Sequence, residues 1–160
     1  MATCMVTGSF DPFTLGHLDL VRRVSGIFDR VYVAVLVNPS KEYLFSVGHR
    51  IQIIQAAVAE YDNVQCVSYA GMTYELAKEL GVDFLVRGIR STVDFEYELD
   101  MADYNLHEGG VDTLCLMTNQ LADVSSGAVR ERLLHGEPLE GLLPEQCIGL
   151  VKELYATKLR

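Results

Sequence analysis

The sequence predicts an α/β protein with a single Rossmann-like domain, in which helices flank a five-stranded parallel sheet. Two observations lead to this fold class. Short apolar runs rich in β-branched residues alternate with stretches of helical periodicity along the chain. These runs are nearly continuous, which is typical of parallel strands covered on both faces. The length of 160 residues fits one domain, assigned here to residues 1–160.

Five apolar runs predict the strands. The first is short, the second (RVYVAVLV) is the richest in valine, and the other three have the same character over fewer residues. The predicted ranges are Ala2–Val6, Arg30–Val37, Val64–Tyr69, Phe84–Val86 and Asp112–Met117.

Helical periodicity fills the intervals between the strands and continues after the last one. Apolar residues recur every three or four positions around Leu18–Val24, Ile51–Val58, Tyr74–Leu80, Phe95–Ala102, Val129–Leu134 and Ile148–Leu159. Gly81 is expected to end the third helix, and Gly136–Pro144 is expected to form a loop. The alternation of strands and helices implies right-handed crossovers and therefore a parallel sheet.

The formal net charge of -9 disfavours nucleic acid and anionic membrane as partners, because both attract basic surfaces. A small anionic substrate remains compatible with this charge, since a few converging basic side chains dominate at short range. The four cysteines form no CxxC pair, so a zinc site is not expected, and we expect reduced, buried thiols. No apolar run approaches 18 residues and no secretory leader pattern is present, so we expect a cytoplasmic protein.

Chemistry-bearing residues follow each predicted strand. The five segments are Gly8–His17, Asn38–Lys41, Met72–Thr73, Arg87–Arg90 and Asn119–Ser126. In open parallel sheets, ligands bind beyond the carboxyl ends of the strands. We therefore expect these five segments to converge on one ligand site.

The segment Gly8–His17 joins a strand to a helix and predicts an anion site. Its glycines and proline favour a tight turn with exposed N–H groups, and the helix that follows directs its positive end to the same place. The chain has neither the GxGxxG of dinucleotide-binding dehydrogenases nor the GxxxxGK[ST] of P-loop ATPases. From its chemistry alone, His17 is either a capping and packing residue or a donor to a phosphate that gains charge.

This segment, GSFDPFTLGH, resembles the HxGH signature of a nucleotidyltransferase superfamily. The form with threonine in place of the first histidine, TxGH, is similar to the phosphopantetheine adenylyltransferase family in particular. The resemblance continues in Asn38–Lys41, Arg87–Arg90, Asp94–Glu98 and Val124–Ser126, and it covers nearly the whole chain. It implies a nucleotidyltransferase fold and transfer of the adenylyl group of ATP to 4′-phosphopantetheine. The products are dephospho-CoA and pyrophosphate, in coenzyme A biosynthesis.

The resemblance also implies roles for individual residues. The catalytic residues would be His17, Lys41 and Arg90. Residues Ser9, Lys41, Thr73 and Arg87 would bind the acceptor. ATP would contact Ser9, Phe10, His17, Gly88, Ile89, Arg90, Glu98, Leu121, Ala122, Asp123, Val124, Ser125, Ser126 and Gly127. Each has a plainer interpretation as well: a solvated loop lysine, surface ion pairs, an acidic helix face or serine helix caps.

Mg²⁺ is expected as the cofactor, bound mainly through ATP, with no protein residues assigned as metal ligands. By resemblance, the protein is a homohexamer and CoA acts as a feedback inhibitor. The sequence departs from the family pattern at Thr7 (usually Pro), Ser9 (usually Thr), Thr118-Asn119 (usually Pro-Ser) and Gly127 (usually Ser). Two other functions stay open: transfer to nicotinate mononucleotide or glycerol phosphate, and a non-catalytic nucleotide sensor.

Overall fold

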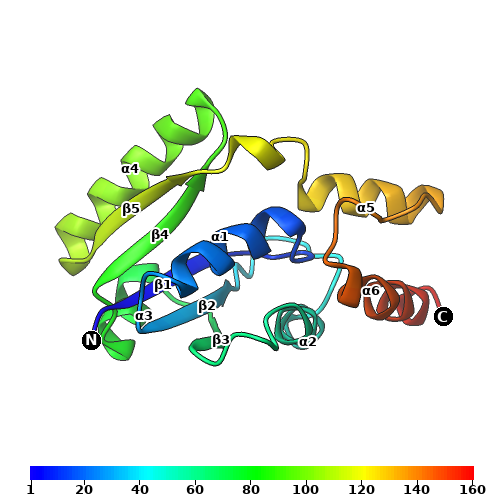
Figure 1. Cartoon of the computed structure of the whole chain (residues 1–160), viewed down its shortest axis with the longest axis horizontal. Coiled ribbons are helices and arrows are strands. Elements are labelled where there is room, and N and C mark those ends of the chain that lie inside the picture. The colour runs from blue at the N-terminus through cyan, green and yellow to red at the C-terminus, as the bar shows by residue number, and fades with distance from the viewer.

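Five parallel strands form one sheet, as predicted, and their order is β3-β2-β1-β4-β5 (Figure 1). The structure is a computed structural model that describes the main chain of residues 1–160 and every side chain except that of Asn119. The strands are β1 Thr3–Gly8, β2 Arg30–Leu36, β3 Val64–Tyr69, β4 Phe84–Ile89 and β5 Asp112–Met117. The order reverses at β1, so the point between β1 and β4 is where a ligand is expected in this fold.

The predicted strand ranges hold for β3 and β5 and differ at the other three. Strand β2 ends at Leu36, one residue before its predicted end. Strand β1 continues to Gly8, two residues beyond its predicted end. Strand β4 continues to Ile89, three residues beyond its predicted end. The added part of β4 is less apolar, but pairing with β5 keeps it extended, with Arg87 opposite Cys115 and Ile89 opposite Met117. Both extensions carry polar residues toward the site.

Six α-helices and one short 3₁₀ helix connect and follow the strands. Their bounds are α1 Leu15–Ser25, α2 Val47–Ala57, α3 Thr73–Leu80, α4 Thr92–Gly109, η1 Asn119–Leu121, α5 Ser126–His135 and α6 Glu145–Lys158. Ser46, Ser91 and Ser125 cap α2, α4 and α5, each accepting a main-chain N–H at the helix start. Gly81 ends α3 in the left-handed conformation, as predicted.

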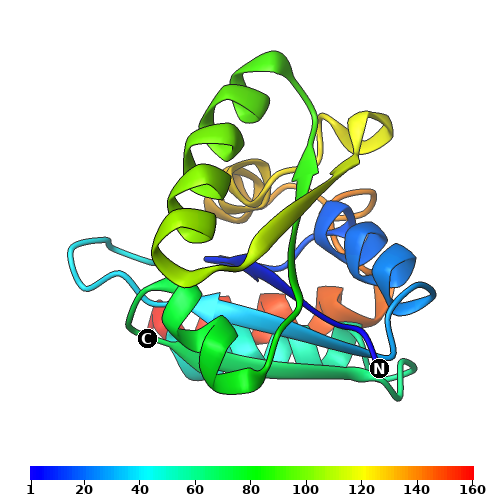
Figure 2. The same cartoon turned by 90° about the vertical axis from the view of Figure 1, so that its left-hand side faces the viewer.

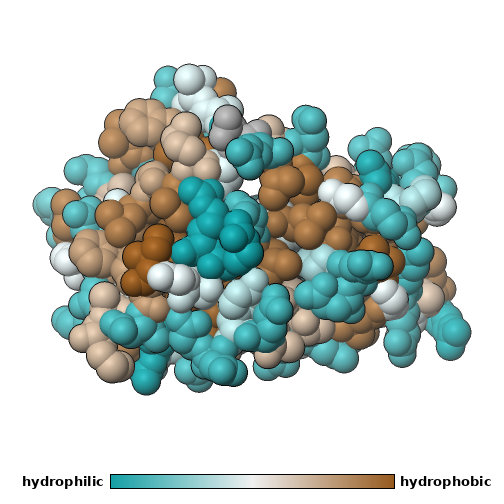
Figure 3. Space-filling model, in the orientation of Figure 1, coloured by the Kyte–Doolittle hydropathy of each residue, from teal (hydrophilic) through white to brown (hydrophobic). Residues whose placement is uncertain are grey.

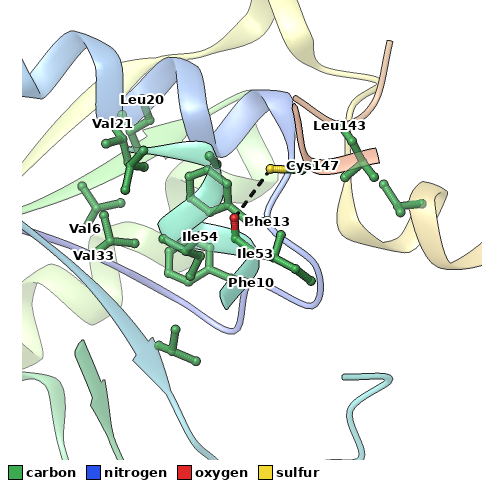
Figure 4. Close-up of a cluster of buried hydrophobic side chains, with 14 of the residues drawn as sticks. Val6, Phe10, Phe13, Leu20, Val21, Val33, Ile53, Ile54, Leu143 and Cys147 are labelled. Carbon is green, nitrogen blue, oxygen red and sulfur yellow. Dashed lines mark hydrogen bonds between the residues drawn. The ribbon is translucent and has the colours of Figure 1, made fainter. Parts of the chain in front are cut away.

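Helices cover the two faces of the sheet unequally (Figure 2). On one face, buried valines of β1, β2 and β4 pack against α1, α2, α5 and α6, in the cluster that includes Phe13 and Ile54 (Figure 4). On the other face, a smaller cluster joins Met5 and Leu85 to α3. Helix α4 lies beside β4 and β5 and contacts α3. None of the described helices is both long and apolar enough to cross a membrane.

The buried face of α4 differs from the face that its apolar residues suggest. Phe95 and Leu99 are 51% and 57% exposed, whereas Glu98 and Asn105 are buried. The reason differs for the two residues. Glu98 is buried against Arg87 of β4, to which it is ion-paired, whereas the Asn105 amide donates to the Met101 carbonyl within α4. A second expectation also fails, because Cys115 is exposed on the edge strand β5. All four cysteines are free thiols, and Cys4 and Cys147 are buried as predicted.

Candidate active site

Two adjoining cavities open at the carboxyl ends of the strands. The first has a volume of about 350 Å³ and the second about 260 Å³. Both are lined by the residues Thr7, Gly8, Ser9, Arg87 and Glu98, so these five form a shared wall. The wall lies between the ends of β1 and β4, where the strand order reverses. All five predicted segments contribute to one or both cavities.

The first cavity lies between Gly8–His17, the end of β4 and the start of α5. Besides the shared wall, its lining includes Phe10, His17, Gly88, Arg90, Thr118, Leu121, Val124, Ser125, Ser126 and Arg130. The second cavity extends toward α3 and α4. Its lining adds Leu36, Lys41, Thr73, Tyr97, Met101, Asn105 and Thr113.

Contacts from three distant segments fix the shape of Gly8–His17. The buried carboxylate of Asp11 accepts the N–H groups of Leu44 (2.7 Å) and Phe45 (2.8 Å). The guanidinium of Arg50, fully buried on α2, donates to the Ser9 carbonyl at 2.8 Å. Arg130 of α5 donates to the Asp11 carbonyl at 2.7 Å. These hydrogen bonds tie the loop to three other parts of the fold.

Phe10 occupies a conformation that non-glycine residues rarely adopt, with φ of 50°. Its buried ring lies edge-on to His17, with ring centroids 4.9 Å apart, and contacts Phe13 at 5.5 Å. A Cβ on Gly8 would approach the Phe10 ring to 3.1 Å, so glycine suits the turn there. Strained backbone of this kind persists only where the surroundings impose it, as they do here.

The position of His17 is set by the cap of α1. Thr14 is the N-cap, and its main-chain N–H donates to Nδ1 of His17 at 3.0 Å, which completes a capping box. Because Nδ1 accepts this proton, the neutral ring carries its own proton on Nε2, which has no partner among the described residues. Burial lowers the pKa of His17 to about 4, and the charges of Arg87 and Arg90 add to the effect. His17 is thus a neutral N–H donor in the first cavity at physiological pH.

Arg87 crosses the shared wall and is held on two edges. Its Nε and Nη2 donate to the carboxylate of Glu98 at 2.8–3.0 Å. Its Nη1 donates to the carbonyl oxygen of Thr7 and, at 3.1 Å, to the hydroxyl of Thr7. Glu98, which the resemblance assigns to ATP, is therefore engaged by a residue assigned to the acceptor. Its contact with ATP stays a prediction.

Arg90 is more exposed than Arg87, because 40% of its side chain is accessible against 31% for Arg87. Its Nε lies 3.3 Å from the carboxylate of Asp94, one helical turn along. Its Nη1 lies 3.4 Å from the carbonyl oxygen of Val124. Both contacts are long for charged hydrogen bonds, so the guanidinium can turn toward an anion at small cost.

The start of α5 faces the first cavity. Ser125 caps the helix by accepting the N–H of Ala128 at 3.1 Å. Ser126 donates to the carbonyl oxygen of Pro12 at 2.7 Å, which joins α5 to the Gly8–His17 segment. The plainer interpretation of these serines as structural residues therefore applies in this structure. The helix N-terminus itself remains directed at the cavity as an anion site.

The residues predicted from the sequence are distributed as follows. Ser9, Arg87 and Glu98 line both cavities; Phe10, His17, Gly88, Arg90, Leu121, Val124, Ser125 and Ser126 line the first; Lys41 and Thr73 line the second. Ile89, Ala122, Asp123 and Gly127 line neither cavity. Thr118 lines the first cavity, whereas the side chain of Asn119 lies outside the described residues.

Sequence reasoning missed four residues that belong to the site or support it. Arg130 lines the first cavity from α5. It lies four residues after Ser126 and therefore on the same face of the helix, which the sequence could have indicated. Asn105 and Thr113 line the second cavity, where the Thr113 hydroxyl is buried without a hydrogen-bond partner. Arg50 supports the loop from behind, and its sequence neighbourhood gives no sign of this. A buried arginine appears only once the fold is known.

No group of three metal-ligating side chains occurs among the described residues. The carboxylates that line the first cavity are already engaged: Asp11 by main-chain N–H groups, Asp94 by Arg90 and Glu98 by Arg87. The donor set therefore fits a cation that arrives with its own anionic ligands better than one held in a protein cage.

Comparison with known proteins adds an independent finding. A family model described as cytidylyltransferase-like matches residues 5–132. A protein of Porphyromonas gingivalis named phosphopantetheine adenylyltransferase is 44% identical over 142 residues, covering 88% of this chain and 93% of the relative. Proteins with the same name from Clostridium novyi and Symbiobacterium thermophilum are each 39% identical, covering 92% and 98% of this chain and 93% and 98% of the relatives.

Proposed function

Because this chain belongs to the phosphopantetheine adenylyltransferase family, we propose that it transfers the adenylyl group of ATP to 4′-phosphopantetheine. The products are dephospho-CoA and pyrophosphate, and the reaction is a step of coenzyme A biosynthesis. An oxygen of the acceptor phosphate attacks the α-phosphorus of ATP, and the bond from that phosphorus to pyrophosphate breaks. The acceptor phosphate is already ionised at neutral pH, so no general base is needed.

The shared wall between the two cavities is the observation that carries this proposal. ATP occupies the first cavity, and phosphopantetheine occupies the second with its phosphate at the wall. Ser9 and Arg87 line both cavities and therefore lie beside both reacting phosphates. Holding two anions that repel each other in contact supplies most of what this reaction needs from a protein.

His17 contributes a donor whose interaction grows during the reaction. Its Nε2–H has a fixed tautomer, because the N-cap amide of Thr14 occupies Nδ1. The α-phosphate gains charge in the transition state. The neutral imidazole stabilises that charge by donating its Nε2–H from a fixed position, and no proton transfer is needed. Arg90 and the N-terminus of α5 add positive potential on the same side.

Lys41 supplies charge to the acceptor phosphate. It lies on the loop after β2 and lines the second cavity. Its ammonium forms no ion pair with a described residue, whereas Arg87 is largely neutralised by Glu98. Lys41 therefore provides the less compensated charge at the acceptor side and screens the repulsion between the two phosphates.

Mg²⁺ enters with ATP in this proposal. When bound, it would neutralise the triphosphate and assist departure of pyrophosphate. The carboxylates that line the first cavity already have partners in the protein, which supports binding of the ion mainly through the phosphates. Removal of Mg²⁺ with EDTA should abolish turnover, and added Mg²⁺ should restore it.

The assembly, the regulation and the location of the protein belong to the same proposal. Self-association is supported by the exposed apolar residues of α4 and β5, which Figure 3 shows at the upper left, and the proposed number of six subunits comes from the family resemblance. CoA shares its pantetheine arm and nucleotide with the product, so it can compete for both cavities as a feedback inhibitor. We place the protein in the cytoplasm, where ATP is available.

The proposal is tested by following pyrophosphate release from ATP and Mg²⁺ with different acceptors. Phosphopantetheine should support turnover, whereas unphosphorylated pantetheine should not, because it lacks the nucleophile. Nicotinate mononucleotide and glycerol phosphate should also fail. Turnover with either of these and none with phosphopantetheine would show that phosphopantetheine is not the acceptor. Binding of ATP with no turnover for any acceptor would favour a nucleotide sensor.

A further inference from the structure

Most of the N–H donors of the Arg87 guanidinium are already hydrogen-bonded to other groups of the protein. An arginine has five N–H donors. The Nε–H and one Nη2–H go to Glu98, and Nη1 serves both the carbonyl and the hydroxyl oxygen of Thr7. One Nη2–H is left. The side chain of Arg87 is 31% exposed and lines both cavities.

Thr7 lies beside Arg87 because of the register between two central strands. Val6 of β1 is opposite Val86 of β4, so the next residues on each strand are also neighbours. Their side chains point to the face that α4 covers, as do those of Met5 and Leu85 two residues earlier. Thr7 is only 8% exposed, and its hydroxyl has Arg87 as its hydrogen-bond partner.

We propose that Thr7 is a positioning residue for adenylyl transfer, whose hydroxyl fixes the plane of the Arg87 guanidinium against Glu98. The single free Nη2–H of Arg87 is thereby directed at the acceptor phosphate. This inference rests on the proposed function, in which that phosphate lies at the shared wall.

The guanidinium of Arg87 is planar and is held on two edges. Glu98 holds the edge formed by Nε and Nη2, and Thr7 holds the opposite side at Nη1. Without the hydroxyl, Nη1 has two N–H groups and only the carbonyl oxygen of Thr7 to receive them. The guanidinium can then swing on its Glu98 edge, and the free donor loses its fixed direction.

The main test uses three variants. Thr7→Val removes the hydroxyl at nearly constant shape, and Thr7→Ser keeps the hydroxyl. Thr3→Val makes the same change at the far end of β1, away from both cavities. Thr7→Val should raise KM for phosphopantetheine about five- to tenfold, a factor in the range that the loss of one hydrogen bond produces. The affinity for ATP should stay within about twofold, and Thr7→Ser and Thr3→Val should match the wild type.

A second measurement tests whether Thr7 holds the Arg87 guanidinium in place, and it needs no turnover. Dicarbonyl reagents modify accessible guanidinium groups, and peptide mass spectrometry measures the rate at residue 87. Thr7→Val should speed modification of Arg87 several-fold, and Thr7→Ser should not. If wild-type protein fails to use phosphopantetheine but Arg87 shows this pattern, the proposed function is wrong, while the positioning of Arg87 by Thr7 is still supported. Equal effects of Thr7→Val and Thr7→Ser, or no effect of Thr7→Val on either measurement, would overturn the inference.

Discussion

The two ring nitrogens of His17 have different surroundings. Nδ1 accepts the main-chain N–H of Thr14, and Nε2 is left with the ring proton. Capping and the proposed catalytic role, which are alternatives from the sequence, are therefore compatible in one side chain. The cap selects the tautomer, and the tautomer supplies the donor.

Replacing His17 by Ala should lower kcat by about 10²- to 10³-fold, the usual cost of losing one donor to developing charge. The dissociation constant for ATP should change far less, because the interaction grows only in the transition state. Stopped-flow or steady-state kinetics with calorimetry of ATP binding measures both.

His17→Gln is the matched control for folding, because glutamine at this position preserves the capping box with Thr14. Only the Ala variant should lose about 1 kcal/mol of unfolding free energy from the missing cap. Equal losses of ATP affinity and kcat in the Ala variant would contradict the role given to His17.

The lowered pKa of His17 makes stability depend on pH. The ordinary value is 6.5 and the folded value about 4, so between these pH values the unfolded chain binds a proton that the folded chain does not. The contribution is fully present above pH 6.5 and declines as pH falls toward 4. Relative to His17→Gln, the wild type should lose about 2 kcal/mol of unfolding free energy between pH 7 and 5. Denaturant titrations at the two pH values measure this, and an unchanged difference would refute the shift.

At the scale of elements, three glycines distinguish the effect of side-chain packing from the effect of backbone conformation on stability. Gly109 ends α4 where a Cβ would overlap the side chain of Tyr74 on α3. Gly110 has open space but φ of 67°, and Gly149 of α6 is exposed with nothing within 4 Å. The contact between α3 and α4 depends on the first of these glycines, because it lets the two helices approach.

Alanine at each position should therefore give a different result. Gly149→Ala should stabilise by about 0.5–1 kcal/mol through helix propensity. Gly110→Ala should cost about 1 kcal/mol through its left-handed backbone. Gly109→Ala should cost more than Gly110→Ala, since Tyr74 must move. Thermal unfolding of the three variants measures the order, and a stabilised Gly109→Ala would show that α3 and α4 are loosely packed.

At the scale of the whole molecule, the exposed side of α4 and β5 is the main surface without a partner in a single described chain. Phe95, Leu99, Leu106, Leu114 and Met117 are each at least 41% exposed. Exposed apolar residues that gather on neighbouring elements are typical of association surfaces.

Leu99→Asp should therefore dissociate the hexamer that we propose. Sedimentation equilibrium should give six times the chain mass of 17.8 kDa for the wild type and smaller species for the variant. Leu159→Asp, the same change at an exposed leucine near the C-terminus, should leave the mass unchanged. A monomeric wild type would reject the assembly.

Features that depend on local apolar patterns could be predicted from the sequence, whereas features that depend on contacts between distant residues could not. The strands and most helix positions could be predicted, because burial on both sides of a parallel sheet leaves continuous apolar runs. The end of β4 and the buried side of α4 could not, because polar residues there satisfy one another across the site. The Thr7–Arg87 contact joins residues 80 positions apart and depends on strand register, which no local pattern reveals. The loops could be placed at one edge from the fold class alone, but the partners of Arg87, Ser125 and Ser126 could not.

In the proposed arrangement, the wall shared by the two cavities also affects how tightly a joined molecule binds. Dephospho-CoA contains the nucleotide of one substrate and the arm of the other, so in this arrangement it reaches both cavities at once. Once one half is bound, the other half is present at a high effective concentration beside its own cavity. Joining the two substrates therefore turns a two-body encounter into an intramolecular one, and it slows escape of the product. The same arrangement that brings the phosphates together makes a bisubstrate compound the natural template for an inhibitor of this protein.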